Sequence, residues 1–272
     1  MNKLLCSTGA LITGRNNRNH MLLAKAGQQL TCEGYEFMMY QSWYEKWEQI
    51  AADVAAMDVS VVTFHVDKGI GELISKNGEG EMELAVERFV INCRMACIMG
   101  AKLLVLHLWG GLASDGNIAV NIEKYRELRE IADSFGLLLT VEDVPCNREN
   151  PLKHMIALHK LYPDISFTFD VRFAAFHGLF EECLSENQAW LWQGPVKHIH
   201  IGDFAGEPMD WESLRSCKHP REGKIDFVKF FAHLKKVGYD GTVTVESTAV
   251  AEDGSILTDK LNDTFAYLRS LM

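Results

Sequence analysis

The sequence predicts an α/β fold in which eight parallel strands close into one (β/α)8 barrel, also called a TIM barrel. Short apolar runs rich in β-branched residues alternate with longer helix-patterned segments along the whole chain, which is typical of parallel βαβ units. Eight such runs in 272 residues give a repeat of about 34 residues, enough for one strand, one helix and two loops. No linker rich in Pro, Ser or Gly divides the chain, so we expect one domain over residues 1–272.

Each expected strand is a short run of β-forming residues bounded by polar or glycine-containing segments. In chain order the strands cover residues 4–11, 34–39, 60–65, 103–108, 137–143, 166–170, 196–201 and 242–247. The expected helices cover residues 43–56, 81–99, 122–135, 151–161 and 226–237. Gly100, Gly136 and Gly238 each follow one of these helices, where a left-handed helix cap places glycine.

An open, doubly wound sheet has the same alternation of strands and helices. Its dinucleotide-binding form carries the motif GxGxxG after the first strand, whereas here the first strand runs into Thr8, Gly9 and Ala10. Eight units follow one another without a change of pattern, which favours closure into a barrel.

The composition indicates which class of partner and which cell compartment to expect. Lys and Arg total 27 against 37 Asp and Glu, a formal net charge of -10, which argues against a nucleic-acid partner. The seven cysteines are odd in number and include no CxxC pair, as expected for reduced thiols in a cytoplasmic protein. The apolar stretch at the amino end is broken by Ser7, Thr8 and Gly9, and is too short and too polar for a signal peptide or a membrane span.

Metal-competent side chains end four consecutive strands of the expected barrel. They are Glu142, Asp170, His200 and Glu246. The carboxyl ends of the strands form the rim on which barrel active sites are built, so these side chains are expected to converge. One such residue alone is better explained as a helix cap or a hydrogen-bonded core residue, but four in succession predict a shared metal site.

Three carboxylates and one imidazole form a hard, oxygen-rich ligand set. Such a set suits one divalent ion, Mn, Mg or Co, with Zn also acceptable. No Cys closes the set, so coordination positions stay open for substrate oxygens or water, and the metal is expected to be catalytic. The residues two positions earlier face the barrel interior and are expected either to orient the ligands or to fill a narrow layer of the core. They are Thr140, Thr168, His198 and Thr244.

At these residues the chain resembles the xylose isomerase-like barrel superfamily, which contains sugar-phosphate isomerases, ketose 3-epimerases, inosose dehydratases and endonuclease IV. In the carboxyl half the resemblance is carried by LLLTVED, FTFDVRFAAFHG, HIHIGD and REGKIDFVKFFAHLKKVGYDGTVTVES. In the amino half CEGYEF, TFH and GAKLLVLHLWGG are similar to the second, third and fourth strands of the superfamily. The likeness covers nearly the whole chain and is looser before residue 60. It implies the metal ligands named above, places Glu36 at the substrate, and puts His65 and His107 on strands three and four.

The chain departs from this pattern at two positions. The epimerases and the endonuclease often have a His three residues after the sixth-strand Asp, where this chain has Phe173, and His177, seven residues after that Asp, is the candidate to replace it. The epimerases often have an Arg six residues after the metal-binding His, where this chain has Gly206. Both departures argue against the best-known ketose epimerase specificity.

The endonuclease branch needs further metal ligands, including a DxH pair after the seventh strand. The corresponding segment here is CKHPREGK, which has His219 but no such pair, so a three-zinc cluster is not expected. His65 and His107 are therefore interpreted as contacts to substrate or to the metal ligands, with purely structural roles as the alternative.

The resemblance and the ligand set together predict a metal-dependent isomerase or epimerase of a sugar, sugar phosphate or related keto-polyol. A divalent ion beside a carbonyl and a hydroxyl oxygen stabilises the enediolate formed when the carbon acid loses its proton. Glu142 and Glu246 come from the two ends of the four-strand arc and are the expected acid/base pair. Trp109 and Phe173 are expected among the aromatic residues that wall the substrate pocket.

Two segments at the rim are long enough to act as lids, residues 67–81 and residues 204–213. Asp203, which directly precedes the second of them, is expected to tie down the loop after the seventh strand.

Three other functions stay open from the sequence. A dehydratase or lyase of an inosose-type substrate uses the same metal and a Glu to expel water. An endonuclease IV-like phosphodiesterase needs further metals and a basic groove, and a non-catalytic barrel only binds sugar. The expected partner is a small-molecule sugar or polyol, with no nucleic acid and no membrane. Exposed faces of such barrels often pair, so a homo-oligomer is compatible with the sequence.

Overall fold

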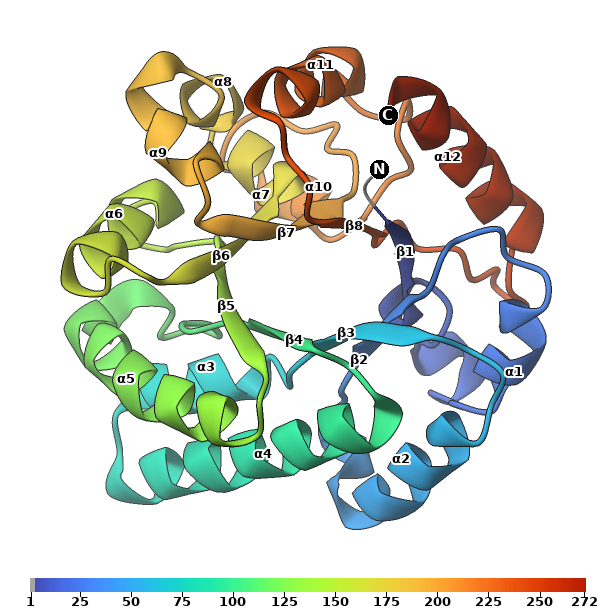
Figure 1. Ribbon diagram of the computed structural model, residues 1–272, viewed down its shortest axis with the longest axis horizontal. Coiled ribbons are helices and arrows are strands. Elements are labelled where there is room, and N and C mark those ends of the chain that lie inside the picture. Colours follow the sequence, from blue (N-terminus) through green and yellow to red (C-terminus); the bar gives the residue numbers. More distant parts are fainter. Residues whose placement is uncertain (1–2) are drawn as a thin grey trace.

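Eight parallel strands close into a barrel in chain order, with β8 paired to β1, in a computed structural model that describes residues 3–272 (Figure 1). The predicted (β/α)8 fold is confirmed. The strands are β1 Leu4–Ser7, β2 Tyr35–Met38, β3 Val61–His65, β4 Leu103–Leu106, β5 Leu138–Glu142, β6 Ser166–Asp170, β7 Val196–Ile201 and β8 Thr242–Val245.

Helices form a ring outside the strands (Figure 1). The α-helices are α1 Leu22–Gly27, α2 Trp47–Ala55, α3 Gly69–Lys76, α4 Glu79–Met99, α5 Ile118–Ser134, α6 Pro151–Leu161, α7 Val171–Phe176, α8 Phe180–Cys183, α9 Ala189–Trp192, α10 Trp211–Leu214, α11 Phe227–Val237 and α12 Thr258–Leu271. The 3-10 helices are η1 Thr8–Ala10, η2 Gly14–Asn16, η3 Gln41–Lys46, η4 Asp115–Asn117 and η5 Glu186–Gln188.

The predicted strands agree with the observed ones in position, and β6 and β7 agree at both ends. The largest difference is at the first strand, predicted to continue to residue 11 but ending at Ser7. The Ser7 hydroxyl accepts a hydrogen bond from the Gly9 backbone N–H at 3.2 Å and caps η1. A capped 3-10 turn competes with strand pairing, so the apolar pattern overestimates the length of this strand.

Residues 67–81 are not a lid, contrary to the prediction. They contain all of α3 and the start of α4, and Ile70 and Ile74 of α3 are fully buried against the body of the protein. The glycines of this segment suggested a loop, but two isoleucines four positions apart place one face of a helix in the core.

Helix α12 was also absent from the prediction. Its buried residues Leu261, Phe265 and Leu268 follow the spacing of one helix face, which packs beside α11 at the end of the chain.

Asp203 anchors the loop after β7, as predicted. Its Oδ1 accepts hydrogen bonds from the backbone N–H groups of Phe204 at 2.8 Å and Ile225 at 3.1 Å, and its Oδ2 accepts one from Gly223 at 2.8 Å. The two ends of this long loop are therefore fixed to one carboxylate. That residues 204–213 act as a lid stays a prediction.

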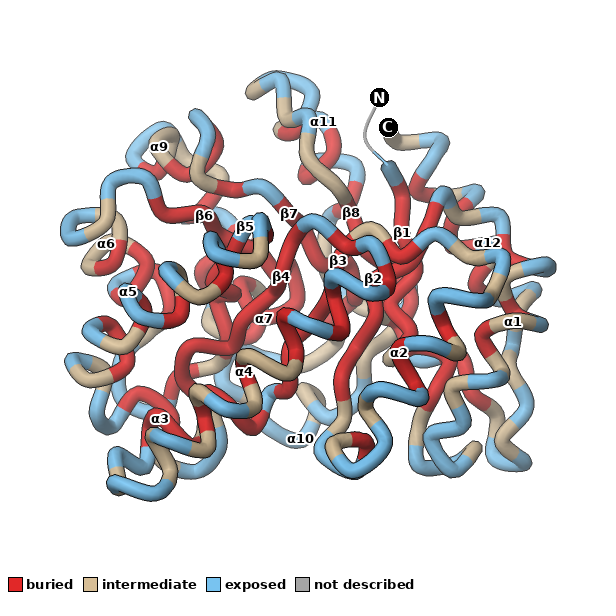
Figure 2. Tube along the Cα trace, turned by 60° about the horizontal axis from the view of Figure 1, so that its bottom comes forward, coloured by how far each residue is buried: buried red, intermediate tan, exposed pale blue. Residues whose placement is uncertain are grey.

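Side chains alternate between the barrel interior and the surrounding helices along each strand. On β7, His198 and His200 contact groups inside the barrel, while Ile199 and Ile201 belong to the hydrophobic core. Buried residues concentrate on the strands and on the inner sides of the helices (Figure 2). The polar interior and the carboxyl ends of the strands are therefore where a site is built.

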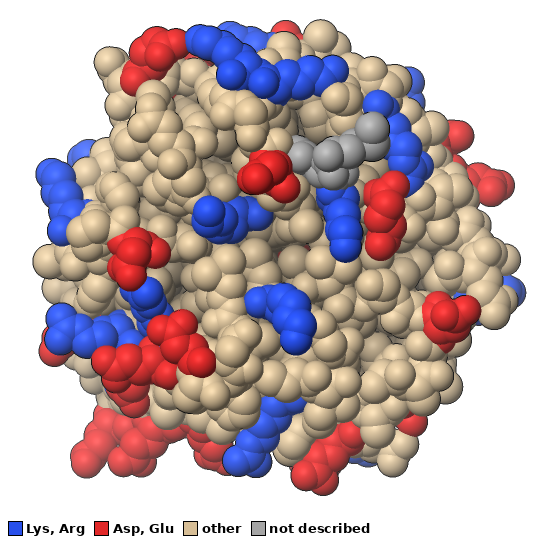
Figure 3. All heavy atoms as spheres, in the orientation of Figure 1, with Lys and Arg blue, Asp and Glu red and all other residues tan. Residues whose placement is uncertain are grey.

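The opposite end of the barrel carries the start of β1 and the carboxyl end of the chain (Figure 2). Gly100, Gly136 and Gly238 lie in turns that lead back to strands at this end, with φ of +85°, +70° and +68°, so the predicted left-handed helix caps are confirmed. On the face drawn in Figure 3, basic and acidic side chains are interspersed among uncharged ones. Among residues 3–272, no helix is both long enough and apolar enough to cross a membrane.

Candidate functional site

Four side chains from the carboxyl ends of β5 to β8 lie together at the mouth of the barrel. Each offers one donor atom, and these atoms all lie within 4.8 Å of one another. They are Glu142, Asp170, His200 and Glu246, of which the first three are buried and Glu246 is partly exposed. The structure thus brings together the four residues predicted as metal ligands, and we call them the ligand group.

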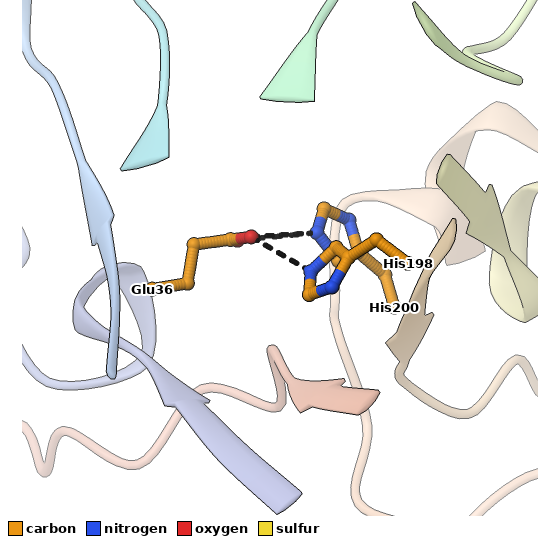
Figure 4. A group of neighbouring side chains, drawn as sticks. All are labelled: Glu36, His198 and His200. Carbon is orange, nitrogen blue, oxygen red and sulfur yellow. Dashed lines mark hydrogen bonds and ion pairs between the residues drawn. The ribbon is translucent and has the colours of Figure 1, made fainter. Parts of the chain in front are cut away.

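His200 is held between two carboxylates, one at each ring nitrogen. Its Nδ1 lies 2.8 Å from Oε1 of Glu142, and its Nε2 lies 3.1 Å from Oε1 of Glu36. His198 donates from Nε2 to Oε2 of Glu36 at 2.9 Å, so one carboxylate accepts from two rings (Figure 4). With Nε2–H of His200 directed to Glu36, Nδ1 is the ring nitrogen that faces the ligand group, where it would bind a cation in place of its proton.

Glu36 lies in the barrel interior and is fully buried. It also accepts a hydrogen bond from the Thr63 hydroxyl at 3.1 Å. Burial opposes its ionisation, but the charge of His200 and the hydrogen bond from His198 hold the pKa of Glu36 well below its usual range. Three protein groups thus occupy the carboxylate of Glu36, and none of its surface is accessible, so its contact with substrate stays a prediction.

The threonines beneath the ligand group do not reach the ligands. The Thr140 hydroxyl donates to the Leu104 carbonyl at 2.8 Å and lies 2.7 Å from the Thr168 hydroxyl. Of the four residues predicted to lie under the metal, only His198 acts on a ligand, and it does so through Glu36. Thr140 and Thr168 fill a layer of the core and bond to each other, which was the alternative interpretation.

Asp170 shows that the ligand group fits a cation. Its Oδ1 accepts from the backbone N–H groups of Arg172 at 2.7 Å and Phe173 at 3.1 Å, but its Oδ2 is buried and has no hydrogen-bond partner. Burial, only partly offset by Arg172, together with the charge of Glu246, raises the pKa of Asp170 to about 7. A buried, unpartnered carboxylate oxygen among other carboxylates is stabilised by a bound cation, so the residues present fit a divalent metal.

A second set of donors lies beside the first and shares Glu142. Oε2 of Glu142 lies 2.7 Å from Nε2 of His107 and 3.3 Å from Nε2 of His65. The Nδ1 atom of His65 faces the Val66 carbonyl at 2.8 Å, so it carries the proton and Nε2 presents a lone pair in the neutral ring. All three facing atoms are buried, and together they too can hold a metal ion.

Three residues predicted to contact substrate are engaged elsewhere. Trp109 is fully buried and its Nε1 donates to the Val144 carbonyl at 3.2 Å. Phe173 is buried, with the Arg172 guanidinium 4.6 Å from its ring centroid. The Cys146 backbone N–H donates to Nε2 of His177 at 3.1 Å. That these three residues contact substrate stays a prediction, because the direction of a side chain in a rim loop is not fixed by the strand period that places the ligands.

A cavity of about 700 Å³ opens over the ends of β2, β3 and β4. His107 lines this cavity and also contacts Glu142, so the cavity borders the ligand group. The aromatic ring of Tyr40 lines the cavity as well. Sequence reasoning missed two further lining residues, Arg18 and Lys68. Arg18 follows the predicted strand 4–11, and Lys68 follows the predicted strand 60–65. Their place after the carboxyl end of a strand, on the rim of the barrel, could have indicated that they border the site.

Comparison with known proteins adds the family. Residues 23–271 match the family model described as xylose isomerase-like TIM barrel. The chain belongs to this family. The match spans all the strands from β2 onwards and includes the whole ligand group.

Individual relatives of this xylose isomerase-like TIM barrel are distant. Uncharacterized protein MJ1311 of Methanocaldococcus jannaschii is 26% identical over 187 residues, which are 63% of this chain and 61% of that protein, so less than two thirds of the relative is matched. D-allulose 3-epimerase from Methylomonas sp., crystallised with D-allulose, superposes with a TM-score of 0.73 and 14% identity over 100% of this chain and 97% of the other. The IolI protein with a bound zinc atom superposes with a TM-score of 0.72 and 16% identity over 98% of each chain. At these identities the likeness shows the fold.

Proposed function

We propose that this xylose isomerase-like barrel is a divalent-metal-dependent isomerase or epimerase of a sugar, sugar phosphate or related keto-polyol. The observation that carries the proposal is the ligand group, with the unpartnered Oδ2 of Asp170 and the oriented Nδ1 of His200. A bound Mn, Mg or Co ion, or Zn, would supply positive charge for the enediolate that forms on the substrate.

Glu142 and Glu246 are the proposed acid/base pair. Burial opposes ionisation of Glu142, but the charges of His200 and His107 hold its pKa well below its usual range, so the group is an ionised carboxylate at neutral pH, the form in which a base acts. Glu246 follows β8 and is partly exposed at the mouth. One residue removes the proton from the carbon acid and the other returns one, a role that contributes about 10²–10⁴-fold for each positioned group.

Other residues bind and enclose the substrate in this proposal. His107 borders both the cavity and Glu142, which supports a contact with a substrate oxygen. His65 is fully buried behind it, 4.9 Å between ring centroids, and supports the position of Glu142. The solved relative that holds D-allulose supports a sugar as the substrate class, and the relative that holds zinc supports a metal.

A dehydratase or lyase is the main alternative, because it uses the same ligand group and differs only in the expulsion of water after the enolate forms. Phosphodiester hydrolysis is favoured by one observation, the second donor set formed by His65, His107 and Glu142. Two metal ions sharing a carboxylate are typical of phosphoester hydrolases. The number of metal ions bound per chain separates this candidate from an isomerase.

The decisive experiment incubates purified protein of known metal content with ketoses, aldoses and inososes in deuterated water. An isomerase or epimerase incorporates deuterium at the carbon next to the carbonyl, and mass spectrometry and NMR identify the carbon and the product. Product that has lost water indicates a dehydratase. The isomerase proposal is contradicted if the metal-loaded protein labels none of these compounds.

A further inference from the structure

The cavity beside the ligand group is large enough for a small organic substrate. Its volume of about 700 Å³ falls within the range of ligand pockets, which is roughly 300–1,000 Å³. Its lining includes His107, whose Nε2 lies 2.7 Å from Glu142. A substrate whose reacting carbon lies at Glu142 therefore extends its remaining atoms into this cavity.

The acidic side chains of the lining are already paired. Asp67 accepts a hydrogen bond from the Gly69 backbone N–H at 2.9 Å and lies 3.5 Å from Nη1 of Arg88. Glu72 lies 3.2 Å from the Lys76 ammonium. Their negative charges are thus matched within the protein and do not attract or repel a ligand strongly.

The basic side chains of the lining, Arg18 and Lys68, have no ion-pair partner in the described part of the chain, unlike the acidic ones. Both are exposed, and neither forms an ion pair with any of residues 3–272. The chain as a whole has a net charge of -10, so its excess of acidic residues does not lead one to expect two unpaired cations at one cavity.

Arg18 is fixed in place by its own loop. Its backbone has a φ of +48°, in the left-handed region, and its N–H donates to the Thr13 carbonyl at 2.9 Å. Thr13 and Asn16 form a capping box that orders this turn. The guanidinium lies 5.0 Å from the ring centroid of Tyr40, whose hydroxyl donates to the Ile12 carbonyl at 2.5 Å. The stacking holds the charged group at the wall of the cavity and leaves its N–H donors free.

We propose that the substrate carries an anionic group, a phosphate ester or a carboxylate, and that Arg18 and Lys68 bind this group. The inference rests on the proposed function and adds the substrate class to it. A guanidinium binds either oxyanion with two parallel hydrogen bonds, and an ammonium adds a compact charge. A neutral sugar leaves both cations without a partner.

The test compares three related compounds by calorimetry on the metal-loaded protein at low salt. They are D-fructose, D-fructose 6-phosphate and the keto-uronate D-fructuronate. At least one of the two anions should bind about tenfold or more tightly than fructose, and the tighter one tells whether the site takes a phosphate or a carboxylate. Arg18→Gln and Lys68→Gln should each weaken binding of that anion about tenfold or more, and leave fructose unchanged.

Two matched variants serve as controls. Arg94→Gln removes an exposed cation from α4, and Lys102→Gln removes one just before β4, at the other end of the barrel. Neither should change the binding of any of the three compounds. Melting temperatures of all four variants verify that they are folded.

The inference is overturned if the anions bind no more tightly than fructose, or if the control variants weaken anion binding as much as Arg18→Gln and Lys68→Gln do. Deuterium exchange separates this result from failure of the proposed function. If neutral sugars exchange deuterium and the anions bind no more tightly than fructose, the proposal of an anionic substrate is contradicted and the isomerase proposal is not. Absence of exchange into all three compounds and the wider panel contradicts the isomerase instead.

Discussion

Nε2 of His200 lies 3.1 Å from Oε1 of Glu36, although their strands, β7 and β2, are not neighbours and are separated in the barrel by β8 and β1. The contact leaves Nδ1 of His200 directed at the ligand group. Glu36 thus acts as a positioning residue for a metal ligand, the kind of contact whose loss costs metal affinity even though it never touches the metal.

Glu36→Gln is expected to weaken binding of Mn or Co about 10–100-fold. The amide has no charge and offers one acceptor oxygen where the carboxylate offers His200 two, so its NH2 group faces the His200 N–H from one side and the ring is held less firmly. Calorimetric metal titration measures the effect, and Thr63→Val is the control, because it removes only one hydrogen bond to the same carboxylate. Wild-type affinity in Glu36→Gln would show that Glu36 does not position His200.

Glu246→Gln is expected to lower the rate of deuterium exchange about 10²–10⁴-fold at saturating metal, which the three other ligands and the amide oxygen still bind. The partly exposed Glu246 is the proposed proton-transfer group that faces the mouth. Glu45→Gln, which changes an exposed residue of η3, should exchange like the wild type. A non-catalytic sugar-binding barrel instead predicts that Glu246→Gln changes no rate, since there is none to change.

Metal binding should weaken as the pH falls through about 7. The pKa of Asp170 in the metal-free protein is raised to about 7, chiefly by burial, so below that pH a proton must leave Oδ2 before a cation can bind. The apparent Kd for Mn should rise up to about tenfold per pH unit on the acid side. Proton release, measured in buffers of different ionisation enthalpy, should be larger at pH 6 than at pH 8, because the Asp170 proton is added at pH 6 to the one that the charged His200 gives up from Nδ1 at both values.

The same raised pKa makes a prediction about the metal-free protein. Between about 4, where a free Asp ionises, and about 7, the folded state binds more protons at Asp170 than the unfolded state does. The contribution of Asp170 to the free energy of unfolding therefore falls as the pH rises across this window. Asp170→Asn, which has no proton to lose, should show a weaker fall in urea titrations, and an unchanged profile would contradict the assignment.

One metal ion per chain is expected by elemental analysis. His107→Asn should then lower the rate of exchange and leave the metal content unchanged, because His107 contacts Glu142 and the cavity but is not one of the four proposed ligands. Two ions per chain in the wild type, falling to one in His107→Asn, would favour the phosphodiester hydrolase.

Ile74→Ala is expected to lower the free energy of unfolding by about 2–5 kcal/mol. Ile74 is fully buried on α3, in the segment that the sequence suggested as a lid. Chemical denaturation measures the loss, and Lys76→Ala on the same helix should cost far less because that side chain is exposed. A small loss at both positions would restore the lid interpretation.

The fold and the ligand group were predictable because both depend on local patterns. Strand and helix periods alternate along the chain, and Glu142 and Asp170 occupy the last positions of their strands, which the closed barrel places side by side. The role of Glu36 in orienting His200 was not predictable in this way, because it depends on which residues of β7 meet Glu36 inside the barrel. The same holds for Trp109 and His177, whose directions are set by loops.

The orientation of His200 depends on a contact across 164 positions of sequence. A nascent or partly folded chain that has paired only its last four strands already contains all four proposed ligands, yet its imidazole can turn either nitrogen toward a passing ion. Only when the barrel closes does Glu36 hold Nε2 and leave Nδ1 facing the ligands. Tight capture of metal should therefore be the last event in maturation, which protects an unfinished chain from trapping an ion in the wrong geometry.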